Sequence, residues 1–373
     1  MEAQSSRQII STFKLMRPAD DYHEQLYLTL IPLKVVLATQ CVFLAHACQQ
    51  LQDAGIARIK KQFAYTWEKR ISAYYQSPVA IAADAGADAL AEQRQFKVGI
   101  VGAGFMGGQV ARTMLDAGFE PTQLLLATRT PSRQKELAAR GVHLVTDLES
   151  VASRAHVLFL CVLPAHLQDV SRGLRKSVSR QTLVVSLVAG VTRVKLEQML
   201  DSPAAFVLNS EETLTALRAS RIGLPGQGGA PPAAPMKQLT PHLLRLSAAS
   251  LAPELSGLVD LVRAMPVVLT GLELPEGDSR TACLEALLDY KSDTDVASAS
   301  ELLGPLMGGT PLAEVLAATD RAQIKADRVL ELLAMRFEQV LQPLLGGPSL
   351  TEEATVQKVA TGDTSISGFN ALR

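Results

Sequence analysis

The chain has 373 residues, which is enough for two or three domains and a sizeable hydrophobic core. Hydrophobic residues make up 47% of it and charged residues 20%, as in an ordinary soluble protein. The 36 Lys and Arg residues nearly balance the 37 Asp and Glu residues, so the net charge gives no reason to expect nucleic acid or an anionic membrane as a partner.

The cysteines give no sign of a metal site. There are four, and they form neither a CxxC pair nor a zinc-ligand spacing: Cys41, Cys48, Cys161 and Cys283. Small thiols on an apolar helical stripe are usually buried. We therefore predict that the protein binds no metal and occupies a reducing compartment, the cytoplasm or another intracellular one.

The N-terminal region, residues 1–95, is predicted to be a helical extension followed by a linker. Residues 1–17 lack the apolar core of a signal peptide. The most apolar stretch, 26–48, contains Pro32, Lys34, Gln40 and His46, so we predict no membrane-spanning helix.

Apolar residues at three-to-four spacing predict two amphipathic helices in this region, over 35–51 and over 56–74. The second carries Trp67 among several tyrosines. Core packing and an aromatic binding surface both account for these rings. The run 77–92, rich in Ala, Asp and Gly, predicts a linker.

From residue 96 to about 201, short apolar runs alternate with helical patterns, which predicts βαβ units and a parallel sheet. Strands are predicted near 97–101, 124–128, 142–145, 157–162 and 182–188. Helices are predicted near 105–117, 131–140, 147–154, 165–177 and 192–200. The predicted fold class is α/β, a Rossmann-type doubly wound parallel sheet with helical regions on either side in the sequence. Any ligand is expected at the carboxyl ends of the strands.

The first predicted strand runs directly into a glycine-rich turn, Gly102-Ala103-Gly104-Phe105-Met106-Gly107. In a dinucleotide-binding turn of this spacing, the first glycine permits the tight turn and the second admits the pyrophosphate. The third allows the next helix to lie against the strand, and that helix directs its free N–H groups at the phosphates. A glycine turn without a ligand is the alternative, but the flanking strand and helix favour a dinucleotide.

The residues after the second predicted strand indicate which dinucleotide. Arg129 lies 22 positions after Gly107, where a protein that selects NAD usually has Asp or Glu. Arg129, Thr130 and Arg133 would instead match a 2′-phosphate, so we predict NADP rather than NAD. Solvated side chains at the start of a helix are the alternative.

The fourth and fifth predicted strands are nearly continuous apolar runs, as expected for a sheet covered on both faces. Val162 and Pro164 follow the fourth strand, and Ala189 and Gly190 follow the fifth. We predict that these four residues border the nicotinamide side. No base lies beside Cys161 in the sequence, so we predict that this thiol packs and does not react.

After residue 201 the pattern weakens. Residues 205–208 suggest a sixth strand, 223–235 are rich in Gly and Pro, and 312–344 keep a clear helical spacing. The predicted division is 1–95 helical extension and linker, 96–222 dinucleotide-binding domain, 223–240 Gly/Pro-rich linker, 241–345 helical substrate and dimerisation domain, and 346–373 flexible tail.

Four motifs in order resemble the cofactor domain of the pyrroline-5-carboxylate reductases. They are VGIVGAGFMG at 98–107, TRTP at 128–131, LFLCVLP at 158–164 and VSLVAGV at 185–191. The resemblance covers about 96–200. It implies an NADP-binding Rossmann domain, a helical domain that forms homodimers, and hydride transfer between NADPH and a small cyclic imine. By position, Gly102, Gly104, Phe105, Met106 and Gly107 would hold the pyrophosphate; Arg129, Thr130 and Arg133 the 2′-phosphate; and Val162, Pro164, Ala189 and Gly190 would border the nicotinamide.

The chain also departs from that family. Phe105 stands where the family usually has Asn, and Leu163 where it usually has Lys. Its Met-Pro-Asn and Ser-Gly-Ser-Gly-Pro-Ala motifs are missing, with Asn209 and 304–310 as loose counterparts. The polar residues that remain as candidates for the substrate side are Asn209, Lys291, Ser292, Thr294 and Thr310. The catalytic residues are therefore unassigned, and two functions stay open: an NADP-dependent oxidoreductase acting on a small-molecule imine, or a catalytically impaired NADP-binding sensor or scaffold.

Overall fold

A computed structural model describes residues 21–62, 95–219 except 203 and 209, and 241–345 except 253–254, 271, 273, 289–292, 309 and 319–320. Several predictions lie outside the described residues. These are the aromatic residues around Trp67, the linkers at 77–92 and 223–240, the tail at 346–373, and the candidates Asn209, Lys291 and Ser292.

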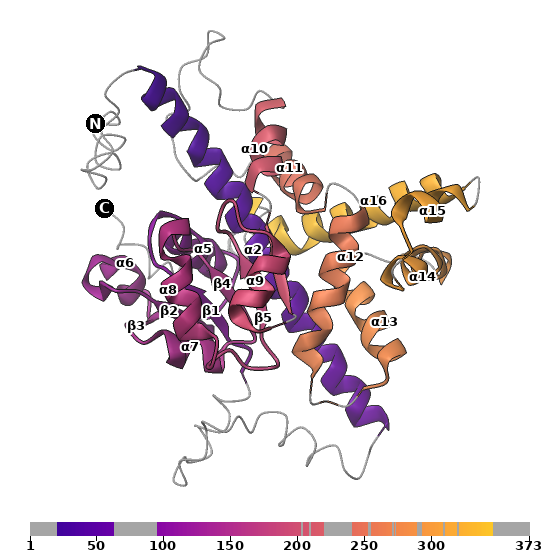
Figure 1. The fold of residues 1–373 in the computed structure, drawn as a ribbon, viewed down its shortest axis with the longest axis horizontal. Helices are drawn as coiled ribbons and strands as arrows, with labels where there is room; N and C mark the ends of the chain where they lie inside the picture. The colour runs from indigo at the N-terminus through magenta and orange to yellow at the C-terminus, as the bar shows by residue number, and fades with distance from the viewer. Residues whose placement is uncertain are drawn as a thin grey trace, which may run out of the picture.

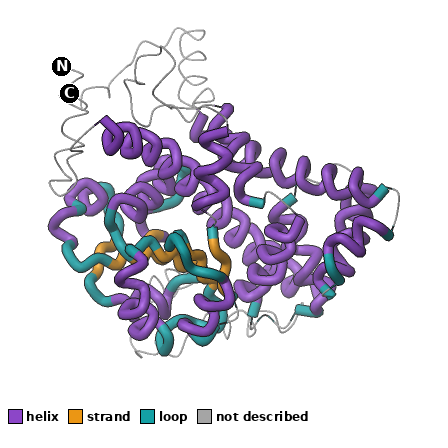
Figure 2. Tube along the Cα trace, turned by 45° about the horizontal axis from the view of Figure 1, so that its top comes forward, coloured by secondary structure: helices purple, strands orange, loops and turns teal. Residues whose placement is uncertain are grey.

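A six-stranded parallel sheet forms one half of the molecule (Figures 1 and 2). Its strands are β1 (Val98–Val101), β2 (Leu124–Ala127), β3 (His143–Val145), β4 (Val157–Leu160), β5 (Leu183–Ser186) and β6 (Ala205–Val207). They are ordered β3-β2-β1-β4-β5-β6, and every neighbouring pair is parallel. The prediction of a doubly wound sheet is confirmed. The order reverses between β1 and β4, which is where such sheets bind ligands.

The helices predicted between the strands lie close to their predicted positions, whereas the short helix at 121–123 and the helix at 210–219, after β6, were not predicted. The helices of this half are α5 (Phe105–Asp116), η1 (Pro121–Gln123), η2 (Pro131–Arg133), α6 (Lys135–Ala139), α7 (Leu148–Arg154), α8 (Pro164–Leu174), α9 (Arg193–Leu200) and α10 (Ser210–Ala219). The predicted helix at 131–140 is two short pieces. The backbone leaves helical geometry at Gln134, with φ −106° and ψ 42°, and the side-chain amide of Gln134 donates to the carbonyl of Ala103.

A long helix, α2 (Asp21–Gln62), lies between the sheet and the C-terminal helices (Figure 1). The prediction of separate helices was wrong here, because 35–51 and 56–62 belong to one continuous helix. Residues 36–45 are buried on every face, which an amphipathic surface helix would not be. The reason is that α2 has neighbours all round, with α5 on one side and α10, α11, α13 and α16 on others.

The C-terminal region is helical, as predicted. It comprises α11 (Pro241–Leu251), α12 (Leu255–Ala264), η3 (Met265–Leu269), α13 (Glu276–Leu287), α14 (Asp293–Met307), α15 (Leu312–Ala317), α16 (Ala322–Leu341) and η4 (Gln342–Leu345). The predicted run at 312–344 is divided into α15, α16 and η4. Among the described helices, none has the length and hydropathy that crossing a membrane would require.

Two hydrophobic cores cover the two faces of the sheet. Ile100, Leu126 and Phe159 face a large core that continues through α2 into the C-terminal helices. Val101 and Leu158 face a second core formed with α7, α8 and α9. Alternate residues of each strand point to opposite faces, so both faces of the sheet are apolar.

Candidate functional site

The glycine-rich turn follows β1 directly, and its three glycines have different surroundings. Gly102 has φ 96°, and its N–H donates to the carbonyl of Ala127 at 2.9 Å. A Cβ on Gly107 would lie 2.0 Å from the carbonyl oxygen of Gly102, so only glycine lets α5 approach the turn this closely. A Cβ on Gly104 would meet no atom within 4 Å, and Gly104 is exposed.

The open space beside Gly104 lies at the beginning of α5. Gly104 is the N-cap of this helix, no side chain caps it, and the first turn contains no acidic residue. Uncapped N–H groups and the positive end of the helix dipole favour an anion at this position. Phe105 and Met106 are half-buried residues of this first turn. The turn can therefore hold a phosphate group with its backbone, as the spacing predicted.

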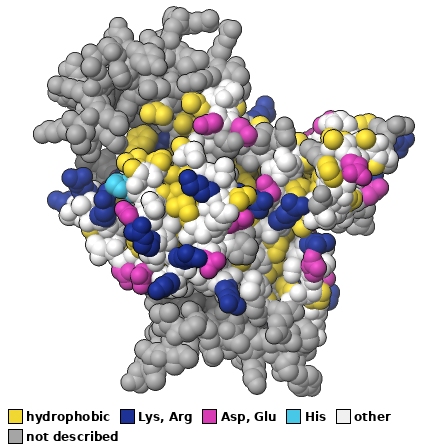
Figure 3. All heavy atoms as spheres, viewed as in Figure 1, with side chains coloured by type: hydrophobic (Ala, Val, Ile, Leu, Met, Phe, Trp, Pro, Cys, Tyr) yellow, Lys and Arg dark blue, Asp and Glu magenta, His cyan; other side chains and the backbone are white. Residues whose placement is uncertain are grey.

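Two arginines stand at the end of β2, beside this turn. Arg129 and Arg133 are exposed, and no ion pair between described residues includes either of them. Thr130 is exposed between them, and its N–H is bonded to the Thr128 hydroxyl at 3.3 Å. Figure 3 shows Lys and Arg side chains gathered at the edge of the molecule where Figure 1 places α6.

The first acidic residue after these two arginines in the sequence, Glu136, forms no ion pair with either of them. Glu136 on α6 pairs with Arg112 on α5, with 2.8 Å between the guanidinium Nε and the carboxylate. Gln134 lies between the two arginines and α6, and its bond to Ala103 ties this loop to the glycine-rich turn. The arrangement leaves two free guanidinium groups next to an anion-binding turn, which suits a ligand with a further phosphate.

The ends of β4 and β5 complete the same edge of the sheet. Val162 is half-buried and Pro164, the first residue of α8, is exposed. Ala189 and Gly190 are exposed after β5, and Gly190 has φ 73° with nothing near its missing Cβ. The structure thus brings every predicted cofactor residue to the carboxyl edge, on the four strands that flank the reversal of strand order.

Cys161 lies within this edge, but its surroundings do not favour a thiolate nucleophile. Burial raises the pKa of its thiol to about 12, so the thiolate is not formed near neutral pH. Its N–H bonds to the carbonyl of Val101 at 2.8 Å, and its Cβ would be 3.1 Å from a Cβ on Gly107. Packing beneath the turn accounts for this residue, as predicted.

The candidates for the substrate side are less well defined. Thr310 is half-buried after α14, with its N–H bonded to the carbonyl of Pro305 at 3.1 Å. Thr294 belongs to α14, and its side chain is outside the described part of the chain. Within the residues that the structure describes, no group of three His, Cys, Asp or Glu side chains could hold a metal ion.

Sequence analysis missed one charged residue at this site, Lys34 of α2. Its Nζ lies 4.1 Å from the centroid of the Phe105 ring. Burial first, and then the charge of Arg112, lower the pKa of Lys34 to about 8. In the sequence Lys34 only interrupts an apolar stretch, because nothing local predicts that α2 lies beside α5.

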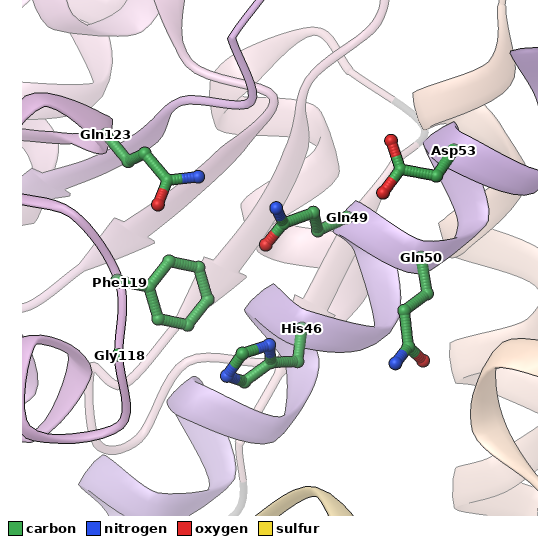
Figure 4. A pocket seen from close by; sticks show the side chains of 7 residues that line it. All are labelled: His46, Gln49, Gln50, Asp53, Gly118, Phe119 and Gln123. Carbon is green, nitrogen blue, oxygen red and sulfur yellow. The ribbon is translucent and has the colours of Figure 1, made fainter.

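A separate hollow of about 310 Å³ lies at the opposite edge of the sheet (Figure 4). It is bounded by α2 and by the loop between α5 and β2, and its lining residues are His46, Gln49, Gln50, Asp53, Gly118, Phe119 and Gln123. Burial lowers the pKa of His46 and raises that of Asp53. Because Gly118 follows α5 and Gln123 precedes β2, this hollow is distinct from the glycine-rich turn.

Comparison with known families identifies the segment that carries the site. Residues 97–190 match the model of a family described as NADP oxidoreductase coenzyme F420-dependent. A mouse protein, NADP-dependent oxidoreductase domain-containing protein 1, is 34% identical over 115 residues, which is 31% of this chain and 31% of that protein. Pyrroline-5-carboxylate reductase 1 of Dictyostelium discoideum is 26% identical over 111 residues, 30% of this chain and 20% of that protein.

Two solved structures of pyrroline carboxylate reductases align with about two thirds of this chain. A pyrroline-5-carboxylate reductase from Coxiella burnetii aligns over 66% of this chain and 98% of that chain, with 17% identity and a TM-score of 0.29. A Plasmodium falciparum pyrroline carboxylate reductase with NADP bound aligns over 66% and 98%, with 14% identity and a TM-score of 0.27.

The sequence matches confirm the resemblance of this segment to pyrroline-5-carboxylate reductases and to a family described as NADP oxidoreductase coenzyme F420-dependent. The sequence matches cover a third or less of the mouse and Dictyostelium proteins. α2 and the C-terminal helices lie outside the segment 97–190.

Proposed function

We propose that this protein is an NADP-dependent oxidoreductase that transfers a hydride between NADPH and a small cyclic imine or a related substrate. The observation that carries the proposal is the open, uncapped turn at Gly104 beside two unpaired arginines, within the segment that matches an NADP oxidoreductase family. The names of the pyrroline-5-carboxylate reductases among the relatives support the imine as substrate class.

The residues present fit this cofactor. The glycine-rich turn offers backbone N–H groups and room to the pyrophosphate, while Arg129, Thr130 and Arg133 offer donors to the 2′-phosphate. A carboxylate at the end of β2 would repel that phosphate, and none stands there. Val162, Pro164, Ala189 and Gly190 would border the nicotinamide, which supplies the hydride when the cofactor is bound.

The rest of the reaction must come from the substrate side. Reduction of an imine requires its carbon about 3–3.5 Å from the hydride donor and a proton donor near its nitrogen. Exposure of Ala189 and Gly190 leaves room for a substrate next to the nicotinamide. The proton donor is unassigned.

A second function, an NADP-binding sensor or scaffold without turnover, is favoured by one observation. Leu163, which follows β4 at the cofactor edge, is 67% exposed and apolar, where pyrroline-5-carboxylate reductases usually have Lys. Such a protein would keep the cofactor turn and lose polar contacts beyond it.

We further propose the division into domains given by the sequence, a homodimer formed through the helices of 241–345, and a reducing compartment such as the cytoplasm. The free thiols of all four cysteines support the last point. Size-exclusion chromatography with light scattering tests the dimer.

The test of the cofactor is selective loss of NADPH binding. Replacing Arg129 and Arg133 by alanine should weaken NADPH binding about tenfold or more and NADH binding less than about twofold, because only NADPH carries the 2′-phosphate. Calorimetric titration measures both dissociation constants. Arg172→Ala, on an exposed part of α8, is the matched control and should change neither.

Turnover distinguishes the two functions. Oxidation of NADPH in the presence of a panel of cyclic imines would support the oxidoreductase. Tight NADPH binding without oxidation in any of these reactions would favour the sensor. Equal weakening of NADPH and NADH in the double variant would contradict the assignment of the 2′-phosphate.

A further inference from the structure

We propose that Lys34 of α2 binds the pyrophosphate of the dinucleotide, so that a helix outside the family-matched segment supplies a cofactor-binding residue. The inference rests on the proposed function, since it requires a dinucleotide on the glycine-rich turn. It adds a residue that the motif at 102–107 does not contain.

The geometry places Lys34 at the beginning of α5. Helices α2 and α5 pack against each other side by side (Figure 1). Lys34 lies over Phe105, the first residue of α5, whereas His46, further along α2, contacts Phe119, which follows α5, with 4.4 Å between ring centroids. α2 therefore crosses the sheet alongside α5, and its Lys34 end is at the carboxyl edge where the cofactor would lie.

The charges around Lys34 favour an anion. Lys34 is half-buried, and no hydrogen bond or ion pair between described residues uses its ammonium group. The charged group that faces it from α5 is Arg112, which has the same sign. A half-buried cation beside a like charge is unfavourable until an anion binds, and a pyrophosphate brings two negative charges.

Acidic side chains on the packed elements do not take this role. On α5, Asp116 pairs with Arg140 at 2.8 Å. Helix α10 has Glu211 and Glu212 in its first turn, both exposed and engaged in other interactions. On α11, Arg245 pairs with Glu338 of α16 at 3.3 Å.

The contact of Lys34 with the Phe105 ring is a cation–π interaction. The alternative role of Lys34 is therefore to stabilise the packing of α2 on α5 without binding a ligand. The two roles differ in what they predict. A residue that only packs on Phe105 affects thermal stability, and affects NADPH and NADH binding only through that stability. A ligand of the pyrophosphate affects the binding of both dinucleotides directly, because the pyrophosphate is common to them.

The experiment is calorimetric titration of the full chain with NADPH and with NADH, for the wild type, Lys34→Met and Lys34→Arg. Methionine keeps the stem and removes the charge, whereas arginine keeps the charge. We expect Lys34→Met to weaken both dinucleotides by a similar factor of about ten, and Lys34→Arg to stay within about threefold of the wild type. Lys176→Met, at an exposed position after α8, is the control and should change neither.

The pH dependence gives a second readout. Because the pKa of Lys34 is lowered to about 8, the wild type loses this charge as the pH rises through that value, and binding of an anion should restore it. Affinity for both dinucleotides should therefore fall from pH 7 to 9.5 in the wild type more steeply than in Lys34→Arg. Binding at pH 8.5 should take up protons, measured as a dependence of the heat on the ionisation enthalpy of the buffer.

Each other outcome has a defined meaning. If the wild type binds NADPH and Lys34→Met binds both dinucleotides as tightly, this inference is wrong and the proposed function stands. If Lys34→Met lowers turnover without changing either affinity, Lys34 acts at the reacting atoms and the inference is overturned. If the wild type binds neither dinucleotide, the proposed function itself fails.

Discussion

The two halves of the molecule, the sheet with its helices and the C-terminal helices, are built by different means. In the sheet half, strands only three or four residues long are fixed by parallel backbone pairing, and one of its cores contains only residues between 101 and 207. Among the described residues of the C-terminal helices, no such self-contained core is found, and Leu243 of α11 packs in a small cluster with Val36 of α2. Their apolar residues join a core that includes α2 and the other face of the sheet. Helix α2 is therefore shared by both halves, and the helical half depends on it.

The largest effect is expected from removing a ring at the centre of α2. Phe43 is fully buried, and its ring centroid lies 4.8 Å from that of Phe337 on α16. Phe43→Ala should lower the free energy of unfolding by about 3–5 kcal/mol, because a large cavity would open in the shared core. Denaturant unfolding followed by circular dichroism measures this loss.

Hydrogen exchange then tests whether the core is shared. In Phe43→Ala, exchange should become faster both in α16 and in the central strands β1 and β4. Leu167→Ala, on α8 in the other core, is the matched control and should affect the sheet half first. If Phe43→Ala leaves exchange in β1 and β4 unchanged, the two halves are independent and the comparison fails.

The same contrast explains what the sequence could predict. In the sheet half the signals are local: the apolar run at 98–101 is followed at once by the glycines, and the strand positions at 124–127 and 157–160 were predicted within two residues. The site at the carboxyl edge follows from this order, since parallel strands bring their ends together. The position of each candidate cofactor residue on that edge could therefore be anticipated from sequence.

The role of α2 could not be anticipated, because it depends on contacts between distant segments. Gln40 of α2, for example, donates to the carbonyl of Ser247 and to the hydroxyl of Ser250, each at 3.0 Å. In the sequence Gln40 is only a polar break in an apolar stretch. Lys34 was overlooked for the same reason, since its neighbour Phe105 is about seventy positions away.

A smaller effect is expected from acid, and it concerns a buried histidine of the sheet half. His156 stacks on Phe96, with 5.3 Å between ring centroids, and its Nδ1 accepts the N–H of Lys97 at 3.1 Å. Burial lowers the pKa of His156 from 6.5 to about 4. The unfolded chain takes up this proton first as the pH falls, so the stabilisation is present above pH 6.5 and is lost between 6.5 and 4.

This pKa shift of His156 corresponds to a loss of about 3 kcal/mol in the free energy of unfolding between pH 6.5 and pH 4. His156→Asn keeps an acceptor for the Lys97 N–H and removes the titration, so its stability should fall less steeply than that of the wild type. Urea unfolding at pH 7 and at pH 4.5 measures both. Burial also lowers the pKa of His46 on α2, so this histidine likewise reduces stability as the pH falls. It is present in both proteins and does not affect the difference between them. Parallel pH profiles for the two proteins would show that His156 does not titrate as described.

The smallest change in stability is expected at Gly104, and it separates structure from binding within one turn. Gly107→Ala places a Cβ 2.0 Å from the carbonyl of Gly102, so the turn or α5 must shift, at a cost of about 1–3 kcal/mol. Gly104→Ala places its methyl group in open space, but alanine is a poorer N-cap than glycine, so the change should cost about 0.5–1 kcal/mol. On the proposed function that methyl group occupies the position of the pyrophosphate. Gly104→Ala should then bind NADPH at least about tenfold more weakly, while its stability falls less than that of Gly107→Ala. Thermal unfolding and calorimetric titration of both variants test this pair.

Wild-type affinity in Gly104→Ala would mean that the dinucleotide does not lie in the open space beside α5. The difference between the sheet half and the helical half would then be a difference in packing alone, without a cofactor site at the carboxyl edge of the sheet.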